Sequence, residues 1–330
     1  MYAVTIDTGT TNTRVYVWKD EQVIGEAFQP VGVRDTAISG NKEKLTQGVK
    51  AAIEVALQAA GIEDRSQVTF FASGMITSNV GLCEIPHLVA PAGKRELARG
   101  MVRMEVPEVI DRPIWFVPGV KNNVPEITLD YAEEMDVMRG EEAETVGVME
   151  KLQLKGPAII ILPGSHSKFI RIDPHSRITG CVTTISGELL DVITKQTILA
   201  SSLQHDFAEE VDEPFLVKGA HYAETVGLGR TCFTLRMLDM FTDATINQKA
   251  NFLLGAVLAT DILAVKNSHA LQVNRDTPMV VCGKKMLRRG LAALIKHDEY
   301  FTGPLTDMDD EHQALSGYGV LAIARERGIW

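Results

Sequence analysis

A strand–polar loop–strand pattern occurs twice in this chain, and it limits the possible folds more than any other feature. Residues 2–6 form a short apolar run that leads into the polar segment DTGTTNT, and residues 14–18 resume a strand-like alternation. The apolar run at 157–162 leads into the loop PGSHSK, and the strand-like FIRID follows. Each pattern predicts a strand, a glycine-containing loop and a returning strand. Two related lobes that face each other would each present one such loop to the cleft between them.

The remaining segments predict an α/β layer in each lobe. Residues 44–60 carry apolar side chains at helical spacing and stop at Gly61, before the strand-like VTFFAS. Later segments predict a helix at about 243–266, a strand at PMVVCG, a helix at KMLRRGLAALIK and a final helix near 311–327. We therefore expect two lobes, each a mixed sheet flanked by helices.

The length of 330 residues supports two lobes, because a single hydrophobic core usually stops growing at about 250 to 300 residues. No low-complexity linker marks the boundary, which we place within 130–155. Our prediction is a first lobe at 1–135 and a second at 136–330. The stretch 207–250 matches no pattern that we can interpret.

The composition restricts the partners and the compartment. A formal charge of −10, from 33 Lys and Arg against 43 Asp and Glu, argues against nucleic acid or an anionic membrane surface. No basic segment with a long apolar core opens the chain, and no stretch approaches the roughly 18 uninterrupted apolar residues of a membrane span. Four cysteines without C-x-x-C spacing indicate buried thiols of a reducing compartment. We expect a cytoplasmic protein.

The first loop has the composition of a phosphate site with a divalent cation. A strand that ends in a carboxylate is followed by a glycine, which lets backbone approach a ligand, and then by hydroxyls and amides. Asp7 would hold Mg²⁺ through water, and the loop would donate N–H and O–H groups to phosphate. An ordinary polar hairpin turn is the alternative. The candidate residues are Asp7, Gly9, Thr10, Thr11, Asn12 and Arg14.

The second loop strengthens the phosphate interpretation, because it repeats this chemistry and adds a cation. Gly164, Ser165 and His166 are its candidate phosphate contacts, and Lys168 would face the terminal phosphates. Taken singly, His166 would be a hydrogen-bonded loop histidine and Lys168 a solvated strand edge.

Carboxylates and an arginine gather between the two loops. Arg139 is followed by a glycine and by Glu141 and Glu142 at a predicted helix start, and Asp136 precedes them. Such a segment can clamp a substrate carboxylate and supply a general base, as transfer of a phosphoryl group to a hydroxyl requires. An acidic first helical turn is the alternative. It explains Glu141 and Glu142 but explains Arg139 less well.

Two further glycine-rich turns have the composition of ligand contacts. The segment GMITSNVG follows a predicted strand, and its Ser78 and Asn79 are candidate substrate contacts. The strand VVCG ends at Gly283 before a predicted helix, which suits an adenine or ribose face. Each is also compatible with an ordinary loop.

These motifs together resemble a known family. DTGTTNTR resembles the first phosphate motif of the superfamily that contains sugar kinases, actin and the heat-shock ATPases. The ordered set GMITSNVG, PHL, MRGEE, LPGSHSK and SGELL, over nearly the full length, resembles the 2-dehydro-3-deoxygalactonokinase family. These middle motifs are far more specific, because the wider superfamily does not share them.

The resemblance implies two actin-like (ribonuclease H-like) lobes around an ATP cleft. It implies transfer of the γ-phosphoryl of ATP, with Mg²⁺, to the terminal hydroxyl of 2-dehydro-3-deoxy-D-galactonate, giving the 6-phosphate in galactonate catabolism. The first lobe would contact the sugar acid, and the second would contact adenosine. The resemblance does not identify which carboxylate is the base.

Three alternatives stay open at this point. The substrate could be a related 2-keto-3-deoxy acid, and the protein could instead be an exopolyphosphatase-like hydrolase or a nucleotide-binding sensor without chemistry. A hydrolase needs a carboxylate that activates water but no sugar-acid clamp, so Arg139 and the Ser78-Asn79 turn favour the kinase. The sequence leaves the oligomeric state open, with a homodimer as one expectation.

Overall fold

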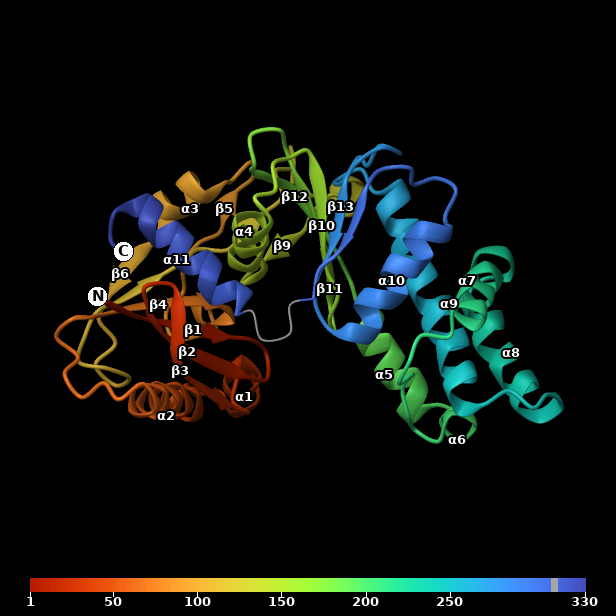
Figure 1. The fold of residues 1–330 in the computed structure, drawn as a ribbon, viewed down its shortest axis with the longest axis horizontal. Helices are drawn as coiled ribbons and strands as arrows, with labels where there is room; N and C mark the ends of the chain where they lie inside the picture. Colours follow the sequence, from red (N-terminus) through yellow and green to blue (C-terminus); the bar gives the residue numbers. More distant parts are fainter. Residues whose placement is uncertain (310–313) are drawn as a thin grey trace.

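The computed structural model describes residues 1–309 and 314–330, and it has two halves, each built on its own sheet (Figure 1). The strands of the first sheet are β1 (Tyr2–Thr8), β2 (Thr13–Lys19), β3 (Gln22–Gln29), β4 (Val68–Gly74), β6 (Val102–Met104) and β7 (Ile114–Phe116). Their order is β3-β2-β1-β4-β7-β6. β1 to β3 form an antiparallel meander, β4 and β7 run parallel to β1, and β6 runs antiparallel to β7.

The second sheet repeats this plan with five strands. They are β10 (Ala158–Leu162), β11 (Ser167–Ile172), β12 (Ile178–Thr184), β13 (Met279–Val281) and β14 (Leu305–Asp307). β10 to β12 form the meander, and β13 and β14 continue parallel to β10, in the order β12-β11-β10-β13-β14. The predicted pair of mixed sheets, each opening with a strand–loop–strand unit, is confirmed.

Helices cover both faces of the first sheet. α1 (Val33–Ser39) and α2 (Glu43–Ala59) lie on one face, where Leu45, Val49 and Ile53 of α2 are fully buried. Their spacing of four residues places them on one side of the helix, as the sequence predicted. α3 (Lys94–Gly100), α4 (Glu141–Leu152) and α11 (Leu315–Arg327) lie on the other face.

α4 and α11 pack closely and lie between the two sheets. A Cβ on Gly147 would lie 2.2 Å from the carbonyl oxygen of Leu315, and one on Gly319 would lie 1.8 Å from that of Ala143. Glycine at both positions therefore permits the close approach of the two helices. The same buried cluster contains side chains of both sheets, so this helix pair joins the two halves.

The second half carries most of the helices. They are α5 (Ser186–Gln196), α6 (Ala200–Leu203), α7 (Glu213–Val226), α8 (Leu228–Phe241), α9 (Ile246–Asn267) and α10 (Lys285–His297). Within the described residues, α9 is the one helix long and apolar enough to cross a membrane, but 78% of its apolar window is buried, and it packs against α7, α8 and α10. It is the central helix of this half. The uninterpreted stretch 207–250 contains α7 and α8.

A small third sheet joins the halves along the free edge of β12. Its strands are β5 (Leu88–Val89), β8 (Val120–Lys121) and β9 (Val137–Met138), and two short 3₁₀ turns, η1 (Met75–Thr77) and η2 (Leu129–Tyr131), lie nearby in the sequence. Ala92 pairs with Ile178 of β12. The Asn122 side chain donates to the carbonyl oxygen of Cys181 and accepts from its N–H, both at 2.8 Å.

The predicted boundary between 1–135 and 136–330 stays a prediction. α4 and α11 belong to the second range, yet both pack on the side of the first sheet, where α11 contacts β1 and β4. The final helix predicted near 311–327 corresponds to α11. Residues 311–313 of that prediction lie outside the described part of the chain.

Candidate active site

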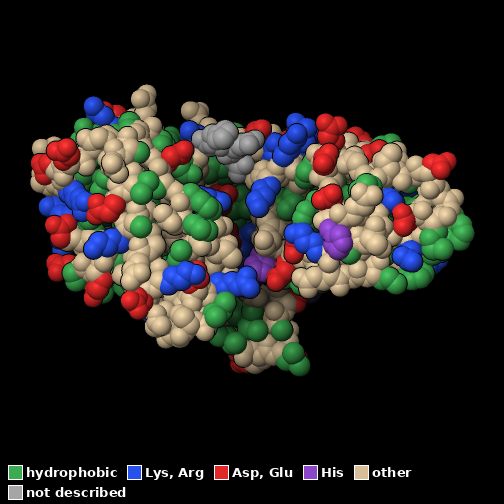
Figure 2. All heavy atoms as spheres, turned by 90° about the horizontal axis from the view of Figure 1, so that it is seen from below, with side chains coloured by type: hydrophobic (Ala, Val, Ile, Leu, Met, Phe, Trp, Pro, Cys, Tyr) green, Lys and Arg blue, Asp and Glu red, His purple; other side chains and the backbone are tan. Residues whose placement is uncertain are grey.

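The two predicted loops line one cavity of about 1130 Å³ between the halves. Thr10 and Thr11 come from the turn between β1 and β2, and Gly164, Ser165 and His166 come from the turn between β10 and β11. Figure 2 shows the hollow between the halves, with Lys, Arg and His side chains around it. Ligand pockets usually measure about 300 to 1000 Å³, so this cavity, at about 1130 Å³, is large enough for a nucleotide.

The rest of the cavity wall belongs mainly to the second half. α5, α9 and α10 and the segment before α7 form a largely apolar surface, suited to a purine and a ribose. Arg34 of α1 is the one further contribution from the first half. The lining side chains outside the two loops include Leu190, Asp191, Thr194, Asp206, Phe207, Leu253, Leu254, Lys284, Lys285, Met286 and Leu287.

The first turn is held largely by its own polar groups. The Gly9 N–H donates to the carbonyl oxygen of Asn12 at 2.8 Å, and the Thr8 and Thr13 hydroxyls lie 3.2 Å apart. The carbonyl oxygen of Thr10 accepts from the Arg34 N–H at the start of α1. These bonds leave the Thr10 and Thr11 side chains exposed toward the cavity.

The second turn is held by its neighbours. The carbonyl oxygen of Ser165 accepts from the Glu188 N–H at 3.0 Å, and a Cβ on Gly187 would lie 2.1 Å from the carbonyl oxygen of Gly164. The start of α5, within the motif SGELL, therefore packs directly on the turn. His166 Nε2 lies 3.0 Å from the Glu188 carboxylate at the rim of the cavity.

Three backbone segments of the first half meet behind the first turn. A Cβ on Gly74, at the end of β4, would lie 2.8 Å from Asp7 Oδ1, and a Cβ on Gly140 would lie 3.1 Å from Gly74 Cα. Both glycines have positive φ, 87° and 119°, which other residues rarely adopt. Asp7 thus lies beside the start of α4. Asp7 itself does not line the cavity; it is partly buried directly behind the residues that do.

The carboxylates around this point differ in environment. Burial raises the pKa of Asp7 to about 6; Arg14 opposes this shift, and Glu141 adds to it. Burial, with a further contribution from Glu141, raises the pKa of Glu142 to about 8. Glu142 is fully buried, its Oε2 accepts from the Gly140 N–H at 2.7 Å, and its Oε1 has no partner within the described residues. Glu141 is partly exposed, and it accepts from the Arg139 N–H at 3.0 Å.

The Arg139 guanidinium is committed to protein groups. One terminal nitrogen donates to the carbonyl oxygen and the hydroxyl of Thr77, both at 2.6 Å, and the other to the carbonyl oxygen of Ile85 and to His87 Nδ1. Burial and the nearby Arg139 and Lys121 lower the pKa of His87 to about 4, so its neutral ring accepts this hydrogen bond. The arginine fork open to a substrate carboxylate stays a prediction, and in this structure both terminal nitrogens contact protein groups.

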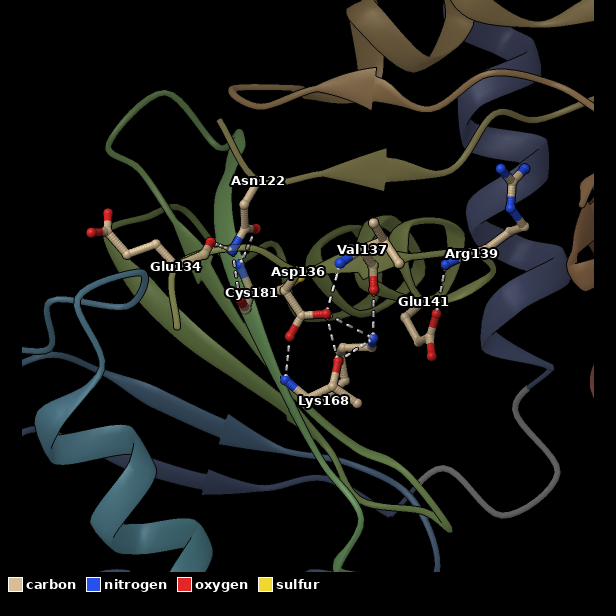
Figure 3. Close-up of polar contacts among 9 residues, drawn as sticks. Asn122, Glu134, Asp136, Val137, Arg139, Glu141, Lys168 and Cys181 are labelled. Atoms are coloured by element: carbon tan, nitrogen blue, oxygen red, sulfur yellow. Dashed lines mark hydrogen bonds and ion pairs between the residues drawn. The ribbon is translucent and has the colours of Figure 1, made fainter. Parts of the chain in front are cut away.

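Asp136 and Lys168 also differ from their predicted roles. The Lys168 ammonium is buried and donates to the carbonyl oxygen of Val137 and to Thr183 Oγ1, away from the cavity (Figure 3). The Asp136 carboxylate accepts from the Thr183 N–H and hydroxyl. Neither residue lines the cavity. The phosphate-facing lysine and the catalytic Asp136 stay predictions, and in this structure both charges are instead met by protein partners.

The other predicted residues do not line the cavity. Gly283, with φ of 108°, packs on Pro163 of the second turn and precedes the lining residue Lys284. The Ser78 hydroxyl is buried and donates to the carbonyl oxygen of Met75, whereas Asn79 is exposed. Gly9, Asn12 and Arg14 belong to the first turn and its flanks but are not lining residues.

The sequence missed most of the apolar wall. Leu253 and Leu254 of α9 and Phe207 before α7 lie in segments whose motifs carry no nucleotide signature. Arg34 was also missed, because it becomes relevant only when α1 starts against the first turn. The segment VVCG, which the sequence suggested for an adenine or ribose face, leads directly into the lining residues Lys284 and Lys285.

A metal site made by protein ligands alone is not found in the described residues, where no group of three His, Cys, Asp or Glu side chains is arranged to hold an ion. A single carboxylate next to a turn that would bind phosphate is compatible with Mg²⁺, because this ion keeps several waters and is usually bound together with substrate phosphates. Asp7 meets that description.

Two repeated sheets with a cavity between their first turns define the class of fold, an actin-like arrangement of two α/β halves. The family model for 2-keto-3-deoxy-galactonokinase matches residues 7–314, and the chain belongs to that family.

Relatives and a solved structure agree with this family. The chain is 28% identical over 204 residues to a probable 2-dehydro-3-deoxygalactonokinase of Rhizobium meliloti, a match that covers 61% of this chain and 59% of the relative. It is 22% identical over 269 residues to the 2-dehydro-3-deoxygalactonokinase of Escherichia coli, covering 82% of each chain. A crystal structure from Sinorhizobium meliloti, provisionally given the same enzyme name, has a TM-score of 0.73 at 22% identity and covers 99% of both chains, which supports the fold.

Proposed function

We propose that this protein transfers the γ-phosphoryl group of ATP to the terminal hydroxyl of 2-dehydro-3-deoxy-D-galactonate and forms the 6-phosphate in galactonate catabolism. The observation that carries the proposal is the shared cavity, which two turns of phosphate-binding composition enter from opposite sheets. Membership in the 2-keto-3-deoxy-galactonokinase family supplies the substrate class. The two relatives carry the name of this activity.

The two halves of the protein would contact different parts of the nucleotide. Hydroxyls and N–H groups of Thr10, Thr11 and Ser165 would bind the phosphates, and the apolar wall of α5, α9 and α10 would enclose adenosine. Lys284 and Lys285 at the start of α10 add positive charge for an anionic ligand. Mg²⁺ bound near Asp7 would neutralise phosphate charge in the transition state.

The sugar acid would bind on the first half, where Asp7, Gly74 and Gly140 meet. The two glycines let the ends of β1 and β4 and the start of α4 pack closely, which brings Glu141 toward Asp7. The substrate hydroxyl would attack the γ-phosphorus there, while the bond from this phosphorus to the β,γ-bridging oxygen breaks and ADP leaves. The hydroxyl proton needs an acceptor nearby.

Glu141 is the better candidate for that acceptor. Glu142 has a pKa of about 8 and no exposure, so it is protonated at neutral pH and cannot take a proton. Glu141 is partly exposed at the start of α4, and its contact with the Arg139 N–H fixes its position. It would accept the proton from the attacking hydroxyl and later release it to water.

Arg139 would contribute to acid recognition indirectly. Its contacts with Thr77, Ile85 and His87 hold the segment that carries Ser78 and Asn79. Asn79 is exposed and offers both a donor and an acceptor to the acid. Arg139 would act as a positioning residue, because its contacts keep the segment with Ser78 and Asn79 in place for the acid.

The test is an ADP-release assay with 2-keto-3-deoxy-galactonate, -gluconate and -arabinonate, each beside a reaction without acid. We expect ADP release that depends on the acid and is fastest with the galactonate derivative, and phosphorus NMR of the product should show a 6-phosphate. Preference for another acid would replace the substrate and keep the kinase. Phosphate release that needs no acid would support the exopolyphosphatase-like alternative. A cytoplasmic location and a homodimer stay predictions, which cell fractionation and sedimentation would measure.

A further inference from the structure

Lys168 bridges the second phosphate turn and the segment before α4. It directly follows the turn, and its side chain is only 7% exposed. Its Nζ donates to the carbonyl oxygen of Val137 at 2.7 Å and to Thr183 Oγ1 at 2.5 Å, and it lies 3.8 Å from Asp136 Oδ1 (Figure 3). Two of the three ammonium donors are used in these hydrogen bonds, and the Asp136 carboxylate lies within ion-pair distance of the same charge. The side chain does not line the cavity.

Asp136 completes the bridge from the other side. Its Oδ1 accepts from the Val137 N–H at 2.7 Å and from Thr183 Oγ1 at 2.9 Å, and its Oδ2 accepts from the Thr183 N–H. A buried ion pair often stabilises a fold less than apolar side chains of the same size would. We therefore attribute to this ion pair a role in fixing the relative position of the two segments that it joins, rather than in stabilising the fold.

The bridge has functional groups at both ends. At one end, the turn before Lys168 lines the nucleotide cavity through Gly164 and Ser165. At the other end, β9 with Val137 leads in four residues to Glu141, past Gly140, which rests against Gly74. A displacement of the turn would therefore reach Glu141 through one side chain and a short, sterically confined piece of backbone.

We propose that Lys168 and Asp136 position the general base in response to nucleotide binding in the second turn. This proposal rests on the proposed function, which supplies the role of Glu141. Both are positioning residues, because neither side chain faces the cavity. Phosphates bound at Ser165 fix the turn, the turn fixes Lys168, and Lys168 fixes β9 and the start of α4.

Hydrogen exchange tests the coupling without any sugar acid. In the wild type, a non-hydrolysable ATP analogue should slow amide exchange in 137–142 as well as in 163–167. In Lys168→Met, protection of 163–167 should remain, and the change in 137–142 should be lost. Equal protection of 137–142 in the variant, or none in the wild type, would overturn the proposal.

A matched control separates coupling from the general cost of removing a buried lysine. Lys249 is similarly buried, with a side chain 9% exposed and an ion pair to Asp239 at 2.6 Å, but it lies on α9 outside this bridge. Lys249→Met should lower the melting temperature and leave the nucleotide response of 137–142 intact. Loss of that response in Lys249→Met too would reduce the effect to destabilisation.

Kinetics supply the second readout. Lys168→Met should lower kcat by about 10- to 100-fold, because a small displacement of a catalytic group costs up to roughly 100-fold, while the Kd of the ATP analogue changes less than about threefold. Asp136→Asn should act on the same step, so the double variant should be little worse than Lys168→Met. A fall in analogue affinity with unchanged kcat would make Lys168 a phosphate ligand after all. Wild-type protein without acid-dependent turnover would contradict the proposed function, and the exchange experiment would still decide the coupling.

Discussion

The turn between β1 and β2 and the turn between β10 and β11 occupy the same place in two sheets of the same plan, but their charges are arranged differently. In the first sheet, Asp7 and Arg14 face each other across the ladder, at the end of the sheet near the start of α4. In the second, β10 ends in Leu162, and the cation Lys168 opposite it is turned into the interior. The β1–β2 turn is flanked by two charged side chains, whereas the β10–β11 turn offers mainly backbone and hydroxyl groups to the cavity.

This difference indicates how a repeated fold divides one reaction. The acidic groups that suit the metal and the proton lie on the first half, around Asp7 and Glu141. The second half lines the cavity with apolar side chains and holds its turn through α5. Substitutions at Asp7 and Glu141 should therefore act mainly on turnover, and substitutions of cavity-lining residues of the second half mainly on nucleotide affinity.

The largest effect is expected at Glu141. Glu141→Gln keeps the size of the side chain and an oxygen for the Arg139 N–H but removes the proton acceptor. Loss of a general base typically costs about 100- to 10,000-fold, so kcat should fall by that factor with the Kd of ATP unchanged. Steady-state kinetics and ATP titration on the same preparation measure both. Unimpaired turnover would remove Glu141 from the chemistry.

The next effect is expected at Asp7 and compares the two turns directly. Asp7→Asn should reduce turnover about 100-fold or more without unfolding the protein, because it removes the charge that serves Mg·ATP. Ser165→Ala in the second turn removes one hydrogen bond to a charged phosphate, worth about 1.5 to 3 kcal/mol, and should raise the KM of ATP about 10- to 160-fold while kcat changes little. Equal losses in the two variants would break the comparison.

The pH dependence of nucleotide affinity sharpens the same point. With a pKa of about 6, Asp7 is protonated below that pH in the free protein, and Mg·ATP needs the carboxylate. Affinity for Mg·ATP should therefore rise with pH up to about 6 and level off above it. Titrations of Asp7→Asn should lack this rise. A wild-type profile as flat as that of the variant would show that Asp7 does not serve the metal.

A smaller effect is expected at Arg139. Arg139→Lys loses the two-nitrogen contact with Thr77, Ile85 and His87, so the segment with Ser78 and Asn79 should loosen. We expect the KM of the acid to rise about 10-fold, the KM of ATP to stay constant and the melting temperature to fall. A direct clamp would instead raise the KM of the acid with an unchanged melting temperature. Measuring all three quantities on one preparation separates positioning from contact.

Periodicity and motif order were enough to predict the fold and the two turns. Strand–loop–strand units and the helical spacing of 44–60 depend on local sequence, and the structure confirms them. The packing of α11 on the first sheet was beyond prediction, because it depends on close glycine contacts such as Gly317 against Trp18. Sequence order alone does not show that this last helix contacts β1 and β4.

Charged residues near a motif were harder to interpret. A lysine beside a phosphate-type loop and an arginine beside two glutamates both suggest ligand contacts, and both are satisfied by distant backbone groups in the fold. Lys168 meets Val137, and Arg139 meets Ile85, through contacts that no local pattern encodes. Residue type predicted the neighbourhood of the site but not the direction in which each side chain points.

The smallest effect is expected at Glu142, and it tests whether burial alone distinguishes the two adjacent glutamates. The folded-state pKa of about 8 lies above the ordinary value of 4.5, so between these pH values the folded protein binds more protons than the unfolded chain. Stability therefore falls as pH rises from about 4.5 to about 8, and each unit of the shift corresponds to about 1.4 kcal/mol at most.

Glu142→Gln keeps the acceptor for the Gly140 N–H, resembles the protonated acid and removes this titration. The melting temperatures of variant and wild type should be similar near pH 5, and the variant should be more stable by a few degrees at pH 8, with kcat unchanged near neutrality. Calorimetry across this pH range would measure the difference. A large loss of kcat in Glu142→Gln would instead make Glu142 the base, because a neutral isostere can replace a buried acid but not a carboxylate that accepts a proton.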